Sequence, residues 1–101
     1  MGRNATISNS PGARIACRFH ARDLHLVMGP VTRGTSARFQ VLLDGLPPGA
    51  AHGGDVDGQG HGTVAQQRLH QLIRQPGPVT ERTAEITFLE PGIEACSFTF
   101  G

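Results

Sequence analysis

Residues 13–29 read ARIACRFHARDLHLVMG, and this stretch decides the fold. Its apolar side chains recur at every second position, at 13, 15, 17 and 19 and again at 24, 26 and 28. A period of two is typical of β-strands that bury one face. Between the two runs, Ala21, Arg22 and Asp23 suit a tight reversal. The stretch therefore predicts two consecutive strands joined by a short turn.

The same period continues through the rest of the chain. It recurs in TSARFQVLLDG (35–45), TAEITFLEPG (83–92) and EACSFTFG (94–101). Each apolar stripe needs a partner, so five such strands favour two facing sheets over a single sheet. We therefore expect an all-β sandwich. The spacing also predicts that every phenylalanine lies on a core face, namely Phe19, Phe39, Phe88, Phe98 and Phe100.

The segment QQRLHQLIRQ (66–75) fits two structures. Leu69, Leu72 and Ile73 have the spacing of a helical stripe. As a strand, the segment would place Leu69 and Ile73 on one face and Leu72 on the other. We favour the strand because the surrounding sequence alternates, and a short helix is the alternative.

The composition bounds the class of protein. A chain of 101 residues supports one compact core, so we expect a single domain over residues 1–101. All nine basic residues are Arg and the net charge is +1, which predicts no nucleic-acid partner. No apolar run is long enough for direct membrane insertion, and MGRNATISNSPGAR (1–14) lacks the apolar region of a secretory signal peptide.

Both ends of the chain resemble strands. ATIS (5–8) is strand-like, Ser10-Pro11-Gly12 suits a turn, and the last residues form a predicted core strand. A domain boundary normally leaves some linker. We therefore expect the C-terminal piece of a longer protein, in which an N-terminal strand of the sandwich can be missing.

Residues 44–62 form a long Gly- and Pro-rich loop, which includes DVDGQGHG (55–62). Loops of this length inside a domain are often functional. Asp55 and Asp57 suit the first positions of a calcium loop, but Gln66 stands where the closing Glu belongs. The two carboxylates are thus weak candidates for a metal site. The pattern favours a turn in which they accept backbone N–H groups.

The histidines suggest a second, weaker metal site. His20 and His25 flank the predicted turn, with His70 as the candidate third ligand, whereas solvent-facing side chains are the simpler interpretation. No G-x-S-x-G context is present, and no cofactor is predicted. We therefore expect no catalysis by this chain itself.

Cys17 and Cys96 are the only cysteines, and they lie far apart without a CxxC pair. Thioredoxin-type dithiol chemistry is thus not encoded here. Both fall on predicted core faces, as free thiols or, in an oxidising compartment, as a disulfide. Outward arginines form either a docking face for an acidic partner or an ordinary soluble surface: Arg14, Arg18, Arg38, Arg68 and Arg74.

Three stretches resemble the C-terminal domain of DipZ-type cytochrome c biogenesis and thioredoxin-family proteins. They are RFHARDLHLVMG (18–29), DVDGQGHGTVAQQRLHQLIRQPGP (55–78) and EITFLEPGIEACSFTFG (85–101), and the resemblance covers about residues 5–101. It implies a jelly-roll sandwich similar to a carbohydrate-binding module. It also implies an extracytoplasmic thioredoxin-like domain and a membrane portion, neither of which is in this chain. His25 and His70 stand where that family's pattern suggests Tyr.

The resemblance predicts a non-catalytic binding or docking module in the cell envelope. Its partners would be a thioredoxin-like domain and a cell-envelope glycan. The alternative is a structural domain that braces a thioredoxin-like domain and binds no glycan. The chain has no Trp or Tyr for sugar stacking, so the candidate ligand-binding residues are polar: His25, Asp55, Asp57, Arg68 and His70.

Overall fold

The computed structural model describes residues 6–8, as backbone, and residues 12–101. Within these residues it contains eight strands and one turn of 3₁₀ helix, η1 (Gly49–Ala51). The strands are β1 (Thr6–Ser8), β2 (Ala13–Phe19), β3 (Asp23–Pro30), β4 (Ala37–Leu43), β5 (His61–Val64), β6 (Arg68–Arg74), β7 (Arg82–Phe88) and β8 (Ile93–Phe100). Ala5 and the predicted Ser10–Pro11 turn lie outside the described residues.

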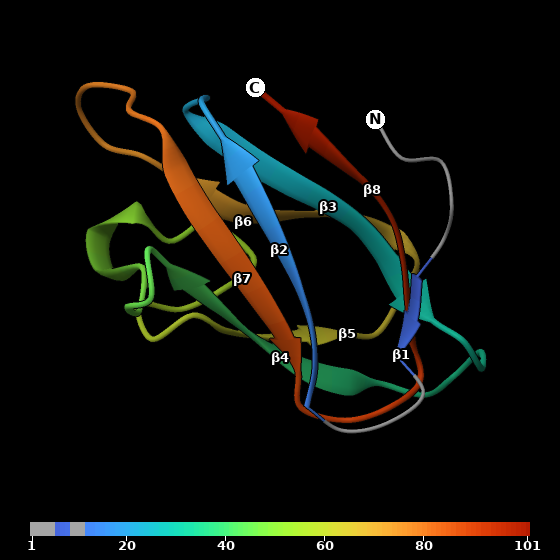
Figure 1. Cartoon of the computed structure of the whole chain (residues 1–101). Coiled ribbons are helices and arrows are strands. Elements are labelled where there is room, and N and C mark those ends of the chain that lie inside the picture. The colour runs from blue at the N-terminus through green and yellow to red at the C-terminus, as the bar shows by residue number, and fades with distance from the viewer. Residues whose placement is uncertain (1–5, 9–11) are drawn as a thin grey trace.

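The strands form two four-stranded antiparallel sheets that pack face to face (Figure 1). Their orders are β1-β8-β3-β6 and β2-β7-β4-β5. This order is that of a jelly roll, in which the chain repeatedly passes from one sheet to the other, although the successive strands β4 and β5 belong to the same sheet. The all-β sandwich expected from the alternation is thus confirmed. The first strand that the structure describes is β1, a three-residue strand that pairs with the edge of β8. The absence of an N-terminal strand stays a prediction.

The core fills the space between the sheets. Alternating residues on the central strands are almost fully buried: Leu24, Leu26, Met28, Phe39, Val41, Ala84, Ile86 and Phe88. These are the positions that the period of two assigned to the interior. Their burial is the main contribution to the stability of the sandwich.

The segment 66–75 is a strand, as favoured above, but the assignment of its faces was wrong. Leu69 is 46% exposed, whereas His70, Leu72 and Ile73 are buried. The cause is a bulge: Leu24 pairs with Ile73 and His25 pairs with Gln71, which leaves Leu72 unpaired. An inserted residue turns the strand, so neighbours on both sides of it reach the core.

A second bulge changes β8. Val27 pairs with Ser97 and Met28 pairs with Ala95, which leaves Cys96 as the extra residue. Before the bulge Ile93 and Ala95 are buried, and after it Phe98 packs against the core. Phe100 lies on the inward face, because it pairs with buried Leu24 and stacks on Phe19 of the opposite sheet, but it is 49% exposed at the end of the strand.

The loop from Asp44 to Gly60 covers one side of the sandwich, which we call the closed side (Figure 1, green). Gly53 N–H donates to Leu72 O at 2.9 Å and Asp55 N–H to Gln71 O at 3.1 Å, so the loop binds the edge of β6. Val41 N–H donates to Gly60 O at 2.7 Å and anchors the loop to β4. Ala51 and Val56 of this loop are themselves buried.

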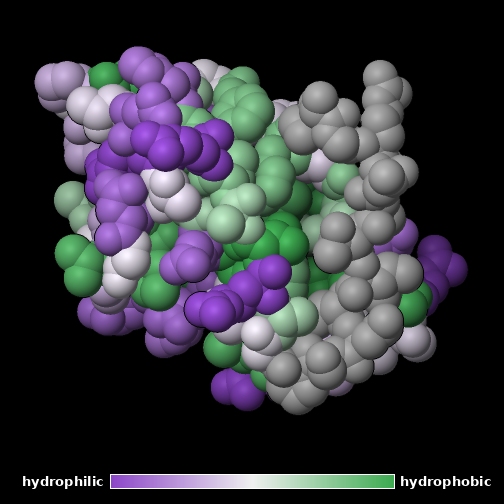
Figure 2. Space-filling model, in the orientation of Figure 1, coloured by the Kyte–Doolittle hydropathy of each residue, from purple (hydrophilic) through white to green (hydrophobic). Residues whose placement is uncertain are grey.

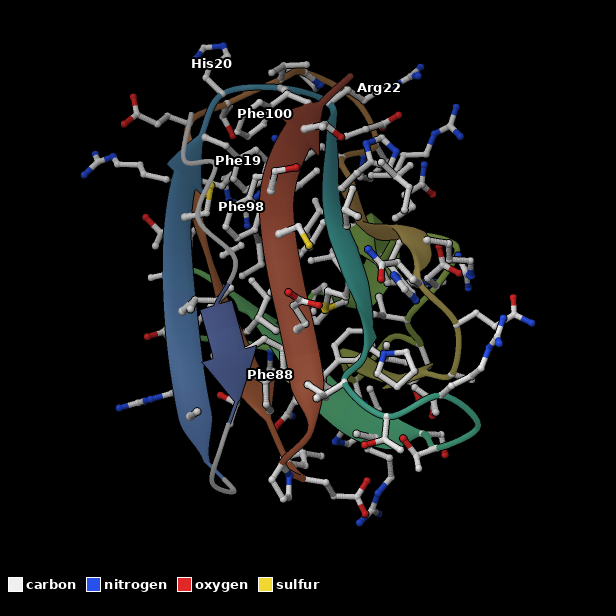
Figure 3. The ribbon with its side chains drawn as sticks, turned by 90° about the vertical axis from the view of Figure 1, so that its right-hand side faces the viewer. Phe19, His20, Arg22, Phe88, Phe98 and Phe100 are labelled. Carbon is white, nitrogen blue, oxygen red and sulfur yellow. The ribbon has the colours of Figure 1, made fainter. Side chains whose placement is uncertain are left out.

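The opposite side, between β2 and β8, is the open side. Inward residues of β2 pack against the core but remain partly exposed: Ala13, Ile15 and Cys17. Figure 3 shows Phe19, Phe98 and Phe100 between these two strands. In the space-filling view, apolar side chains are visible in a hollow near the centre of this face (Figure 2). The loop therefore covers the closed side of the sandwich, whereas apolar side chains on the open side remain partly exposed.

Candidate functional site

Asp55 joins the loop to β6 through its side chain. Its Oδ1 lies 2.7 Å from the Arg68 guanidinium, and its Oδ2 accepts the Gln71 backbone N–H at 2.7 Å. The hydrogen bond with Arg68, followed by the one from Gln71, lowers the pKa of the Asp55 carboxyl in spite of partial burial. The structure thus brings together Asp55 and Arg68, two of the predicted ligand-binding residues, and each already has a protein partner.

Asp57 organises the tip of the same loop. Its Oδ1 accepts the backbone N–H groups of Gln59 at 2.9 Å and His61 at 3.0 Å. These hydrogen bonds, His61 first, lower the pKa of the Asp57 carboxyl. Gly60 adopts a left-handed φ of +87° between them, which suits glycine. DVDGQGHG is therefore an ordered turn whose carboxylates accept backbone N–H groups.

The residues proposed as metal ligands do not converge. The structure places Asp55 against β6 and Asp57 at the loop tip, each with its own partners. Within residues 12–101, no group of three or more His, Cys, Asp or Glu side chains is placed to hold a metal ion. His20 is exposed at the β2–β3 turn, whereas His70 lies inside the sandwich.

His70 does not lie on the outer face, where the sequence placed it. It is 1% exposed, neither ring nitrogen has a hydrogen-bond partner among the described residues, and the ring meets Phe39 edge-on with 6.4 Å between the ring centroids. Burial, with Arg68 nearby, lowers the pKa of the imidazole. His70 pairs with Leu26 across the sheet, whereas His25 lies on the outer face and is half-buried, opposite Gln71 and Thr99.

A pocket of about 380 Å³ opens beside the loop tip. Its walls come from β4, β5, the loop tip and the residue after β7: Arg38, Phe39, Asp57, His61, Gly62, Thr63 and Leu89. Gly62 is required here, because a Cβ atom would lie 2.5 Å from Phe39 Cζ. Asp57 is the one predicted site residue that lines this pocket.

The Arg38 side chain is held in place at the pocket. Its Nε lies 3.3 Å from Glu90 Oε1, while the Arg38 backbone N–H donates to the same oxygen at 2.8 Å. These contacts lower the pKa of the Glu90 carboxyl, the side-chain contact most. Arg38 remains 66% exposed, so its remaining N–H groups can face a ligand.

Sequence reasoning did not select His61 or Thr63 for a site, and it named Arg38 only among the outward arginines. The register explains this, because Arg38 pairs with Thr63 and Gln40 pairs with His61 across β4 and β5. HGTV (61–64) is too short to show a period of two. The one local signal is the Gly-rich sequence before it, which is typical of a turn that leads into a strand: Gly54, Gly58, Gly60 and Gly62.

Cys17 and Cys96 are both free thiols and both partly exposed. Cys17 belongs to β2 and Cys96 to the bulge of β8, so they lie on different sheets. Burial raises the pKa of the Cys17 thiol. A raised pKa reduces the thiolate fraction and hence the reactivity of this cysteine.

A family model described as "Thioredoxin like C-terminal domain" matches residues 1–101. No curated protein matches the chain. Within the described residues, no helix is long and apolar enough to cross a membrane.

Among solved structures, the chain is similar to a family two carbohydrate esterase from Clostridium thermocellum in complex with cellohexaose. The TM-score is 0.68, with 15% identity over 93% of this chain. A family two carbohydrate esterase from Cellvibrio japonicus matches with a TM-score of 0.60 and 14% identity over 96% of this chain. The match spans only 26% and 30% of those two proteins. At such identity the likeness shows the fold alone.

Proposed function

We propose that this chain, which belongs to the family of thioredoxin-like C-terminal domains, is a non-catalytic module that binds a glycan in the pocket beside Asp57. Its role is to position a thioredoxin-like domain in the cell envelope, in an architecture of the DipZ type. One observation carries the proposal: a cation, a carboxylate and a hydroxyl, from Arg38, Asp57 and Thr63, line one pocket.

These groups suit sugar hydroxyls, which both donate and accept hydrogen bonds. Arg38 supplies donors, Asp57 supplies acceptors, and Thr63 supplies both. The Asp57 carboxyl has a lowered pKa, so it is ionised at neutral pH. A sugar as the ligand class is consistent with one comparison: an esterase that contains a part of similar fold, about 26% of its length, was solved in complex with cellohexaose.

Binding here depends on hydrogen bonds without ring stacking. The chain has no Trp or Tyr, and Phe39 is fully buried behind the pocket. Exposed polar contacts give little net free energy once water has been displaced. We therefore expect a Kd on the order of 1 mM for an oligosaccharide.

The contacts of Asp57 support a binding role over a catalytic one. Its Oδ1 accepts two backbone N–H groups, so the carboxylate stabilises the conformation of the loop. A general base would instead need to reach a nucleophile or a substrate proton.

The test is a titration of the ¹⁵N-labelled chain with cellohexaose and with soluble peptidoglycan fragments, followed by NMR. We expect shifts at Arg38, His61 and Thr63 for one glycan. Arg38→Gln should abolish them, whereas Arg14→Gln is the matched control because it lies on the outer face of the same sheet. Shifts that are absent at 10 mM glycan, roughly ten times the expected Kd, would refute the proposal.

The second candidate function is the bracing of a thioredoxin-like domain without glycan binding. The open side favours it, because partly exposed apolar residues there are suited to contact with another protein. Glycan titration separates the two functions, since bracing predicts no shift at the pocket.

A further inference from the structure

His70 is a buried imidazole between the two sheets. The side chain is 1% exposed, and neither ring nitrogen has a hydrogen-bond partner among the described residues. Leu26 of β3 pairs with it in one sheet, and the Phe39 ring of the opposite sheet meets it edge-on. A buried polar group without a hydrogen bond is unfavourable, and a buried charge is more so. The folded chain therefore favours the neutral form of His70.

The long loop closes the sandwich directly beside this imidazole. β6 and β5 are edge strands, one in each sheet. Asp55 of the loop lies against both. A Cβ on Gly62 of β5 would lie 2.7 Å from the Asp55 carbonyl oxygen, and Asp55 Oδ2 accepts the N–H of Gln71, the residue after His70, at 2.7 Å. The loop thus spans the two sheet edges at the position of His70.

Backbone hydrogen bonds hold the same part of the loop on β6. Gly53 N–H donates to Leu72 O at 2.9 Å, and Asp55 N–H donates to Gln71 O at 3.1 Å. Gly54 N–H donates to the Gln71 side-chain oxygen at 2.8 Å. All of these acceptors lie within two residues of His70. A movement that takes His70 out of the core therefore disturbs the residues to which the loop is bonded.

The charged groups that act on His70 are Arg68 of its own strand and Asp55 of the loop. Burial first, and then Arg68, lower the pKa of the imidazole, and Asp55 offsets part of this effect. Asp55 is already bound to Arg68 at 2.7 Å. The other titratable groups of the adjoining elements lie on outer faces, in the loop or in pairs of their own: Asp23, His25, Arg38, Asp44, His52, Asp57, His61 and Arg74. A protonated His70 therefore gains most from contact with water.

We propose that His70 makes the closed side sensitive to acid: when it gains a proton, residues 53–56 detach from β6 and the imidazolium reaches water. The proton then acts as a ligand of the open conformation. Because folding lowers the pKa of His70, closure is complete above the unfolded pKa, near 6.5, and weakens as the pH falls toward the folded value. The proposal does not depend on glycan binding.

The test is amide hydrogen exchange of the ¹⁵N-labelled chain at pH 7 and pH 5, without glycan, expressed as protection factors that remove the intrinsic effect of pH. We expect the protection of Gly53 and Asp55 to fall about tenfold. Asp55 has a lowered pKa, so its own carboxyl stays ionised over this range. At pH 5 both amides should be about tenfold less protected than that of Ile86 in the central strand β7. Equal protection of loop and core would mean that acid unfolds the whole sandwich, and would overturn the proposal.

Two variants assign the proton. His70→Leu should reduce the fall in protection to less than about twofold, because the titrating group is gone. His25→Gln is the matched control, since His25 lies on the outer face opposite Gln71, and it should keep the fall. If His70→Leu does not fold, His70→Gln replaces it, because its amide is neutral at both pH values. A fall that persists without His70, or that disappears in His25→Gln, would overturn the proposal.

Discussion

The closed and open sides of the sandwich differ in how completely the sheet edges and the core are covered. On the closed side, the loop from Asp44 to Gly60 binds the edge of β6 through backbone hydrogen bonds and places Val56 in the core. On the open side, β1 covers three residues of β8, and Phe100 remains half exposed. On both sides of a jelly roll, the sheet edges must be covered or otherwise protected from pairing with another chain. The difference indicates that the long loop completes the fold on the closed side, whereas the described residues of the open side leave apolar side chains partly exposed.

The largest expected effect is the difference in lost free energy of unfolding between substitutions of two phenylalanines. Phe39 is fully buried on the closed side, against Gly62 and His70. We expect Phe39→Ala to lower the free energy of unfolding by about 4 kcal/mol through lost burial and a cavity. Phe100→Ala should cost about 1 kcal/mol or less, since half of the ring is already in water. Urea unfolding measures both, and similar losses would contradict the contrast between the sides.

The second effect tests whether the loop is held rigidly. Gly60 and Gly45 both have a left-handed φ, but a Cβ on Gly60 would lie 2.0 Å from the Val41 carbonyl oxygen, whereas Gly45 has open space. Gly60→Ala should therefore destabilise the chain by about 3 kcal/mol and Gly45→Ala by about 1 kcal/mol. Equal losses in urea unfolding would mean that the loop moves aside easily.

The third effect concerns the clamp between Asp55 and β6. Asp55→Ala should cost about 1–2 kcal/mol, because the Gln71 N–H and Arg68 lose their acceptor. Asp55→Asn should cost less, since the amide oxygen can replace one contact. The pKa of Asp55 is lowered by folding, so this stabilisation is present above its unfolded pKa, near 3.9, and disappears as the pH falls through the folded value. Unfolding measured between pH 7 and pH 3 should show a steeper loss for the native chain than for Asp55→Ala.

The smallest expected effect is the pH dependence of stability that arises from His70. Its pKa is lowered in the folded state, first by burial and then by Arg68. Stability is therefore complete above the unfolded pKa, near 6.5, and declines as the pH falls toward the folded value. His70→Leu should remove this decline between pH 7 and pH 5, whereas His20→Gln, on an exposed residue, should keep it. A decline that survives in His70→Leu would assign the proton to another group.

The period of two was enough to predict the strands on both sides of the core, because central strands bury one face strictly. It failed where the pairing shifts by one residue. The bulge at Leu72 buries His70 and exposes Leu69, and neither outcome is visible in the local pattern QQRLHQLIRQ. A bulge is defined by the partner strand, so a single sequence carries little signal for it.

The candidate site was predicted in part. The turn at Asp57, in which a carboxylate accepts backbone N–H groups, follows from the local Asp and Gly spacing. The pocket does not, because Arg38 and Thr63 come together only through the pairing of β4 with the short β5. Local chemistry was therefore readable from the sequence, and convergence across strands required the structure.

The most direct test of the two-sided account is hydrogen exchange of the isolated chain, resolved by residue with NMR. The account predicts slow exchange for Val41, Gly53 and Asp55, whose N–H groups bind across the closed side. Loop amides that exchange as fast as those of exposed Gly34 and Gly77 would show that the closed side is not closed, and would contradict the account.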